Sequence, residues 1–302
     1  MKLELGINTD FEKEHDRIEE IRKELHQIAD AGFTHIHWCF EWDGDYLYSR
    51  SEMEQIRNWM DECGLKEKSL HASKGSRRAV EEYGKVHYRK DYTSDMEPNR
   101  IAGVELIKNR VELVNVLGGK EIVLHMYLPY KSFENDPASK ELFYAQTFRS
   151  LDELQPFCKE KNVRICIENL FEAPREMQLE QFDKLFERYP ADYMGLCIDT
   201  GHANLVGGND FVQELAVRDA DRLYSLHLND NMGWGDEPGC GDAHRLPGEC
   251  RVDWEALMPL IKASAYEEPF VMEVMKPMGE DIDGYLKRAY EAGVWMAGLA
   301  EK

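Results

Sequence analysis

Short apolar runs recur along the chain and alternate with stretches whose apolar residues repeat at helical spacing. The runs are rich in β-branched or aromatic residues and lie near turn signals, so they predict strands. These strands are expected at residues 2–7, 33–38, 66–71, 121–126, 163–168, 194–199, 223–228 and 269–274. Between them, residues 16–32, 101–117 and 281–299 have the spacing of amphipathic helices, and Gly32 is placed to end the first of these.

This alternation predicts an α/β fold with a parallel sheet, because helical crossovers connect parallel strands. The count of eight strand-helix units favours closure into a (β/α)8 TIM barrel over an open, doubly wound sheet. The 302 residues of the chain match one such barrel, which needs about 250 residues or more. No linker rich in Pro, Gly or Ser divides the sequence, so we expect a single domain over residues 1–302.

Charge and cysteine content narrow the partners and the compartment. With 58 acidic and 37 basic residues, the formal charge of −21 repels phosphate backbones and anionic membranes. A nucleic-acid partner is therefore not expected. The sequence has neither a signal peptide pattern nor an apolar run long enough to span a membrane. The seven cysteines form no CxxC pair, which suits reduced thiols in the cytoplasm.

Residue types that bind metals recur where the predicted strands end. In a TIM barrel all strands end at the same face, so these side chains should meet there. They are His71, His125, Glu168, Asp199, His227 and Glu273, with His202, Asp242 and His244 in the adjoining loops. Carboxylate oxygens and imidazole nitrogens suit Mn, Mg, Co or Zn. A carboxylate in an apolar run is costly to bury without a partner, whereas a lone histidine such as His125 is equally typical of a hydrogen-bonded core residue.

Other candidates are open to two interpretations each. The tryptophans Trp38, Trp42 and Trp234 follow predicted strands and suit either stacking on a sugar or core packing. The basic segment 74–78 suits either a phosphate site or a solvated turn, and Arg245 is equally ambiguous. Cys166 and Cys197 lie inside apolar runs and are interpreted as small core residues.

Five segments, in this order, carry a family resemblance: IENL at 167–170, CIDTGHANL at 197–205, LHLNDN at 226–231, DAHRLPGE at 242–249 and MEV at 272–274. With them the chain resembles the xylose isomerase-like TIM barrel superfamily, which includes sugar phosphate isomerases and epimerases and the class II AP endonucleases. The resemblance covers almost the whole chain. Cys250 is a departure, because PGEG is the commoner ending of the fourth segment.

The resemblance implies different metal sites in its two branches. In the sugar-acting branch, Glu168, Asp199, His227 and Glu273 would hold one divalent metal, with His202 near the substrate. In the nuclease branch, the positions of His71, His125, His202, Asp242 and His244 would join them to hold a trinuclear zinc cluster. The acidic charge of the chain favours the first branch.

The expected function is therefore a metal-dependent isomerase or epimerase of a small sugar or sugar phosphate. Glu168 and Glu273 would transfer the proton through an enediolate. The alternatives are a class II AP endonuclease-like zinc hydrolase, a lyase acting on a keto-polyol, and a scaffold that binds sugar or metal without catalysis. Dimers and tetramers are common in the superfamily. A homo-oligomer therefore stays open as an alternative to a monomer.

Overall fold

In this computed structural model of the protein, the described residues are 3–12, 18–42, 44–72, 80–82, 85–87, 90–267 and 269–301. Eight strands build one sheet: β1 (Leu5–Asn8), β2 (His35–Trp38), β3 (Lys66–His71), β6 (Glu121–Leu124), β7 (Arg164–Glu168), β8 (Met194–Asp199), β9 (Leu223–His227) and β10 (Phe270–Met272). Their order is β10-β1-β2-β3-β6-β7-β8-β9, and every neighbouring pair is parallel.

The two outer strands of this order, β9 and β10, meet and close the sheet. Leu228 forms a parallel bridge with Met272. The amide of Leu228 donates to the carbonyl of Val271 at 3.0 Å, and the amide of Glu273 donates to the carbonyl of Leu228 at 3.3 Å. On the other side of β10, the Asn8 side chain bonds both the amide and the carbonyl of Val274, at 2.9 and 3.1 Å. The expected TIM barrel is confirmed.

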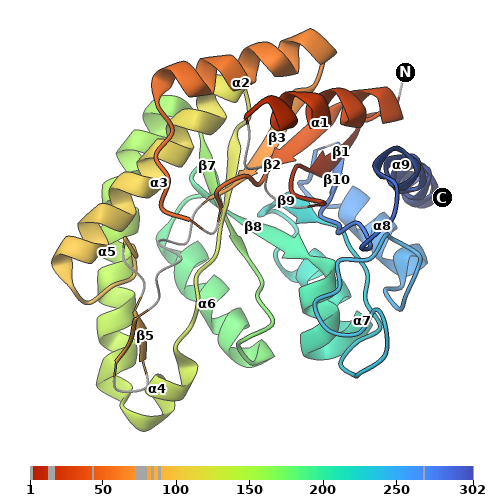
Figure 1. Ribbon diagram of the computed structural model, residues 1–302. Helices are drawn as coiled ribbons and strands as arrows, with labels where there is room; N and C mark the ends of the chain where they lie inside the picture. The colour runs from red at the N-terminus through yellow and green to blue at the C-terminus, as the bar shows by residue number, and fades with distance from the viewer. Residues whose placement is uncertain are drawn as a thin grey trace.

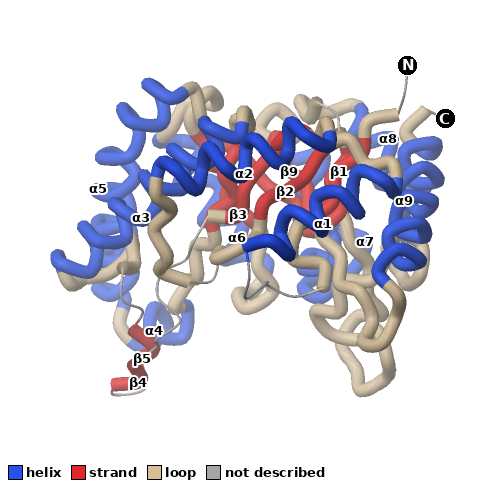
Figure 2. Tube along the Cα trace, turned by 45° about the horizontal axis from the view of Figure 1, so that its top comes forward, coloured by secondary structure: helices blue, strands red, loops and turns tan. Residues whose placement is uncertain are grey.

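Helices surround the strands, as Figures 1 and 2 show. They are α1 (Ile18–Ala31), α2 (Arg50–Cys63), α3 (Glu97–Leu117), α4 (Tyr130–Asn135), α5 (Pro137–Lys161), α6 (Arg175–Arg188), α7 (Thr200–Arg218), α8 (Trp254–Lys262) and α9 (Ile282–Leu299). Local sequence explains several of their ends. Ser49 and Glu52 form a capping box before α2, and Gly64 ends that helix with a φ of 75° that suits glycine.

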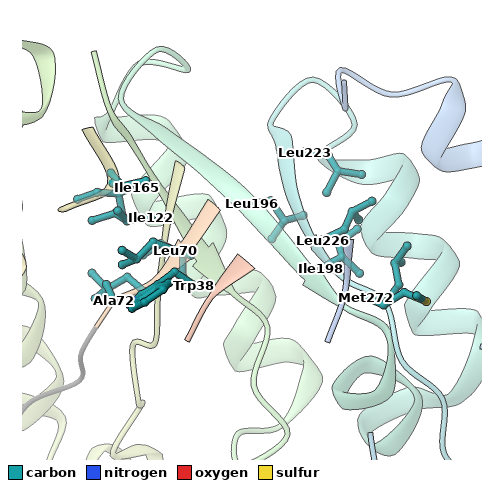
Figure 3. Close-up of a cluster of buried hydrophobic side chains, with 14 of the residues drawn as sticks. Trp38, Leu70, Ala72, Ile122, Ile165, Leu196, Ile198, Leu223, Leu226 and Met272 are labelled. Atoms are coloured by element: carbon teal, nitrogen blue, oxygen red, sulfur yellow. The ribbon is translucent and has the colours of Figure 1, made fainter. Parts of the chain in front are cut away.

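The main core lies between the strands and the helices. Leu70, Ile122, Ile165, Leu196 and Ile198 are buried there, and Figure 3 shows them on the barrel strands. Burying each such side chain contributes roughly 1.5–3 kcal/mol. Because side chains alternate across a strand, the residues between these core positions face the barrel interior.

The strand predictions were right in number and order but not at every boundary. The first strand begins at Leu5 and continues to Asn8, and the last is only Phe270–Met272. One element was not predicted: the antiparallel hairpin of β4 (Val80–Glu82) and β5 (Lys85–His87). In Figures 1 and 2 it lies near α4, away from the barrel strands. Its strands of three residues are too short for a periodicity to reveal. Within the described ranges, no helix is long and apolar enough to cross a bilayer.

Candidate metal centre

Strand parity places the expected residues inside the barrel. Val123, Cys166 and Cys197 form a small buried cluster apart from the main core. His125, Glu168 and Asp199 each lie two positions further along the same chain segments, so they continue the interior face toward the strand ends. Cys166 and Cys197 are fully buried with raised thiol pKa values because of burial, which agrees with their interpretation as small core residues.

Glu168, at the end of β7, lies at the centre of the histidines. Its Oε2 is 3.0 Å from Nε2 of His125, 3.3 Å from Nδ1 of His227 and 3.6 Å from Nε2 of His71. Its Oε1 is 3.1 Å from Nδ1 of His202. Burial opposes ionisation, but His125 and His227 hold the pKa of Glu168 well below its usual value. The surrounding histidines therefore favour the ionised form of Glu168.

Glu273, which directly follows β10, also approaches His227. Its Oε2 is 3.1 Å from Nδ1 of His227, which is fully buried. Burial again opposes ionisation, and His227 lowers the pKa of Glu273 below its usual value. His227 thus lies within reach of two carboxylates, one following β10 and one ending β7.

Asp199 is held by two short hydrogen bonds from neighbouring residues. Its Oδ1 caps helix α7 by accepting from the amide of His202 at 2.6 Å, and its Oδ2 accepts from the side-chain amide of Asn229 at 2.7 Å. Burial raises the pKa of Asp199 to about 6, although His202 and His244 oppose the shift. Its position at the end of β8 agrees with the sequence prediction.

A second group of three side chains lies beside Glu168. Asp242 and His244 belong to the loop after β9, and His202 belongs to α7. Asp242 Oδ1 is 3.0 Å from Nε2 of His244 and 3.3 Å from Nε2 of His202. His244 has a φ of 42°, in the left-handed region, and its Nδ1 is 2.9 Å from the carbonyl oxygen of Glu273. Burial opposes protonation, but Asp242 raises the pKa of His244 to about 10. The loop thereby brings this trio beside the barrel mouth.

The donor atoms fit a divalent metal. Potential ligand atoms of His71, His227 and Glu273 lie within 4.8 Å of one another, as do those of His71, His125 and Glu168. Neither ring nitrogen of the buried His227 makes a well-aligned hydrogen bond within the described structure. Buried polar atoms are normally hydrogen-bonded, so these atoms are available as ligands. All nine predicted site residues therefore come together in one region at the strand ends.

The tryptophans divide into two kinds. Trp38 is fully buried, and its indole donates to the Tyr48 hydroxyl at 3.2 Å, so it is a core residue and is not available to a sugar. The Trp42 ring lies 4.4 Å from the ring of His71 and 5.2 Å from that of His125. Trp42 therefore covers the histidine side of the centre.

Of the basic candidates, Arg245 lies within the described residues. Arg245 is paired with Glu249 at 3.2 Å. Residues 74–78, considered above as a possible phosphate site, lie outside the described residues.

Two residues in contact with the histidines of the centre were missed from the sequence. His37, in β2, is fully buried with its ring 4.6 Å from that of His227, and its Nδ1 is 2.8 Å from Oγ of Ser69. The alternation HIHW and the position near a strand end were a signal for it. Tyr127 was also missed, and its hydroxyl is 2.9 Å from Nδ1 of His125. His37 packs against the ring of His227, and the Tyr127 hydroxyl is placed to orient the imidazole of His125.

A third missed residue, Asp230, organises the loop that carries Asp242 and His244. Its buried carboxylate accepts hydrogen bonds at 2.9–3.2 Å from the backbone amides of residues 231, 248, 250, 251 and 252 and from the indole of Trp254. Asp230 also forms a backbone bridge with Arg245. Cys250 stands where the family resemblance leads one to expect glycine. Its backbone amide nevertheless donates to the carboxylate of Asp230.

Comparison with known proteins identifies the family. Residues 25–292 match the family described as xylose isomerase-like TIM barrel. The chain belongs to this family. The uncharacterized protein y4fM of Sinorhizobium fredii is 35% identical to this chain over 284 residues, which is 90% of this chain and 87% of that protein.

Solved structures share the fold at lower identity. L-ribulose 3-epimerase has a TM-score of 0.70 at 16% identity, with 99% of this chain and 96% of that chain covered. The 3-keto-D-glucoside 4-epimerase YcjR from E. coli has a TM-score of 0.62 at 19% identity, with 99% of each chain covered. These likenesses show the barrel fold of the family, and both neighbours are sugar epimerases.

Proposed function

We propose that this family member is a metal-dependent isomerase or epimerase of a small sugar or sugar phosphate. The observation that carries the proposal is the pair of buried carboxylates Glu168 and Glu273, whose Oε2 atoms lie 3.3 and 3.1 Å from the same nitrogen of His227. The names of the solved neighbours support sugar epimerisation as the reaction type.

The residues that would hold the metal are Glu168, Asp199, His227 and Glu273. A divalent metal bound there supplies Lewis acidity that polarises a substrate carbonyl and acidifies the neighbouring C–H. One of the two glutamates removes that proton, and the other returns a proton from the opposite face. The result is inversion at that carbon. Return of the proton to the adjacent carbon of the same enediolate gives aldose-ketose isomerisation instead.

The electrostatics of the centre suit this role for the glutamates. Burial opposes their ionisation, but His227 lowers the pKa of Glu273, and His125 with His227 lowers that of Glu168. An ionised glutamate can accept the substrate proton, and the glutamate that returns a proton must first have taken one up from solvent. His202, whose Nε2 is 3.3 Å from Asp242, lies beside Glu168 and is placed to contact substrate oxygens.

A second candidate is the class II AP endonuclease-like zinc hydrolase. It is favoured by the trio of His202, Asp242 and His244, whose potential ligand atoms lie within 4.8 Å of one another beside the first centre. The formal charge of −21 opposes it, because DNA binding requires neutralisation of phosphates by basic residues. A lyase acting on a keto-polyol would use the same proton abstraction and differs only in the leaving group.

Elemental analysis of the purified protein, paired with an assay of abasic-duplex cleavage on the same sample, tests the proposal. We expect about one Mn, Mg, Co or Zn ion per chain and no cleavage. About three zinc ions per chain together with cleavage would overturn the proposal in favour of the hydrolase. Absence of metal even after reconstitution would contradict both.

A further inference from the structure

The ends of neighbouring strands bring a further set of possible metal ligands together at one side of the barrel mouth. In the sheet, β1 lies between β10 and β2. Glu273 directly follows β10, and Cys39 directly follows β2. His37 lies two positions before Cys39, so the two side chains share one face of the chain. Potential ligand atoms of His37, Cys39 and Glu273 lie within 4.8 Å of one another, and all three residues are buried.

His37 has one ring nitrogen in use and one left over. Its Nδ1 is 2.8 Å from Oγ of Ser69, which fixes the orientation of the ring. Its Nε2 makes no hydrogen bond within the described part of the chain, although the residue is fully buried. Metal-binding histidines have this pattern, because one nitrogen binds the ion while the other bonds a protein group. The proposed reaction gives His37 no role, so its Nε2 is available to a cation.

Cys39 offers a sulfur atom, which the four ligands proposed above lack. Its Sγ is 3.6 Å from the carbonyl oxygen of His37 and is hydrogen-bonded to the carboxylate of Asp10. Burial, together with Asp10 and Glu273, raises the pKa of this thiol, so Cys39 is a neutral thiol before a cation binds. A bound zinc ion deprotonates a coordinating thiol, and the proton passes to solvent. Asp10 is partly exposed, so this side of the mouth is open to ions.

The chemistry of the donor atoms selects the cation. Thiolate, imidazole and carboxylate together are typical ligands of zinc, and sulfur favours such borderline or soft ions. Magnesium and manganese prefer oxygen ligands. The four ligands proposed above are three carboxylates and one imidazole, which suit hard ions as well as zinc. The two ligand sets therefore differ in the ions that they accept.

We propose that His37, Cys39 and Glu273 form a second cation site, which takes zinc or a similarly thiophilic ion and does not take magnesium or manganese. Glu273 belongs to both ligand sets. A cation bound to Cys39 therefore occupies the carboxylate that the proposed reaction needs for proton transfer. Zinc beyond the first ion per chain is thus an inhibitor. The inhibition rests on the function proposed above, whereas the site does not.

Another buried thiol lies near the centre in a less suitable place. The potential ligand atoms of Cys197 are close to those of Glu168 and His227, which are both already assigned to the first metal. Cys197 also lies within β8, two positions before Asp199, and belongs to the small buried cluster described above. Cys39 instead follows its strand and adds a histidine that the first metal does not use. Cys197 therefore serves as the internal comparison for Cys39.

Cobalt absorption tests the site, because a thiolate bound to Co2+ gives a charge-transfer band in the near ultraviolet that oxygen and nitrogen ligands do not give. The metal-free full-length protein is titrated with CoCl2, and with MnCl2 as the hard ion, and dialysis counts the bound ions. We expect about two Co2+ per chain with the band, and about one Mn2+. Cys39→Ser should lose the band, and His37→Gln should weaken binding of the second Co2+ by more than about 10-fold. The control Cys63→Ser, at a half-buried thiol of α2, should keep the band and both ions.

A measurement on the unaltered protein keeps the proposal testable if a variant fails to fold. X-ray absorption at the zinc edge, with two zinc ions loaded per chain, should show sulfur at about 2.3 Å. The absence of both this sulfur and the cobalt band would overturn the site. The site is also overturned if Cys197→Ser loses the band while Cys39→Ser keeps it.

Deuterium exchange of a ketose by the manganese-loaded protein separates the site from the reaction. Added zinc should slow the exchange at least about 10-fold, and Cys39→Ser should resist this inhibition. Exchange that zinc does not slow, in a protein that shows the cobalt band, would overturn the inhibition and leave the site standing. No exchange with any metal would contradict the proposed function, and the cobalt band alone would then decide the site.

Discussion

Replacing Glu273 by glutamine should lower turnover by about 10³-fold, because a positioned acid or base contributes roughly 10²–10⁴-fold to rate. Glutamine keeps the shape of the side chain but cannot accept a proton. The Oε2 of Glu273 lies 3.1 Å from Nδ1 of His227, inside the centre. The measurement is the rate of deuterium exchange beside the ketone of a ketose in D2O, with the metal content of the variant determined in parallel.

The control for this variant is Glu141→Gln, which makes the same change at an exposed position of α5 far along the chain. We expect it to keep full activity and the same melting temperature. Full exchange activity in Glu273→Gln would sink the assignment of Glu273 as an acid/base group. Loss of metal in that variant would instead show that its main contribution is ligation, since the glutamate is also an expected ligand.

Replacing Asp230 by alanine should destabilise the protein by about 4 kcal/mol. The carboxylate accepts from the amides of residues 231, 248, 250, 251 and 252 and from the indole of Trp254. Without it, several buried N–H groups lose their acceptor, and each unsatisfied group costs about 1–3 kcal/mol. Urea unfolding of the metal-loaded and the metal-free protein measures the loss.

Two companion variants define the cause. Asp230→Asn keeps the size of the side chain but turns an N–H toward donors, so it should lose a large part of the same stability. Asp236→Ala, at an exposed position of the same loop, should change the free energy of unfolding by less than about 0.5 kcal/mol. An Asp230→Ala protein as stable as the parent would contradict the role assigned to these hydrogen bonds.

Most of the fold could be predicted from the sequence because the apolar runs of the barrel strands are separated by segments with helical periodicity. The hairpin of β4 and β5 was not predicted, because strands of three residues give no periodic signal. The ends of β1 and β10 shifted because hydrogen bonding to neighbouring strands, and not the apolar run alone, decides where a strand stops.

The candidate centre was predictable to a similar degree. Strand ends converge in a barrel, so Glu168, His227 and Glu273 could be placed together from their positions alone. Asp230 could not be recognised, because its partners are amides of a loop whose path only the folded chain reveals. Trp38 was ambiguous for the same reason, since its burial depends on contacts with Tyr48 that sequence spacing does not show.

Closure of the barrel by β10 also sets an order of events during synthesis. This strand lies between β1 and β9, which are separated by most of the chain, and Glu273 follows it directly. Domains form as the polypeptide emerges, and pairings between distant segments must wait for the later one. A ribosome-bound chain that has not yet released residue 273 therefore has an open barrel and an incomplete metal centre. In the function proposed above, the metal site would be complete only once this last strand has joined the barrel.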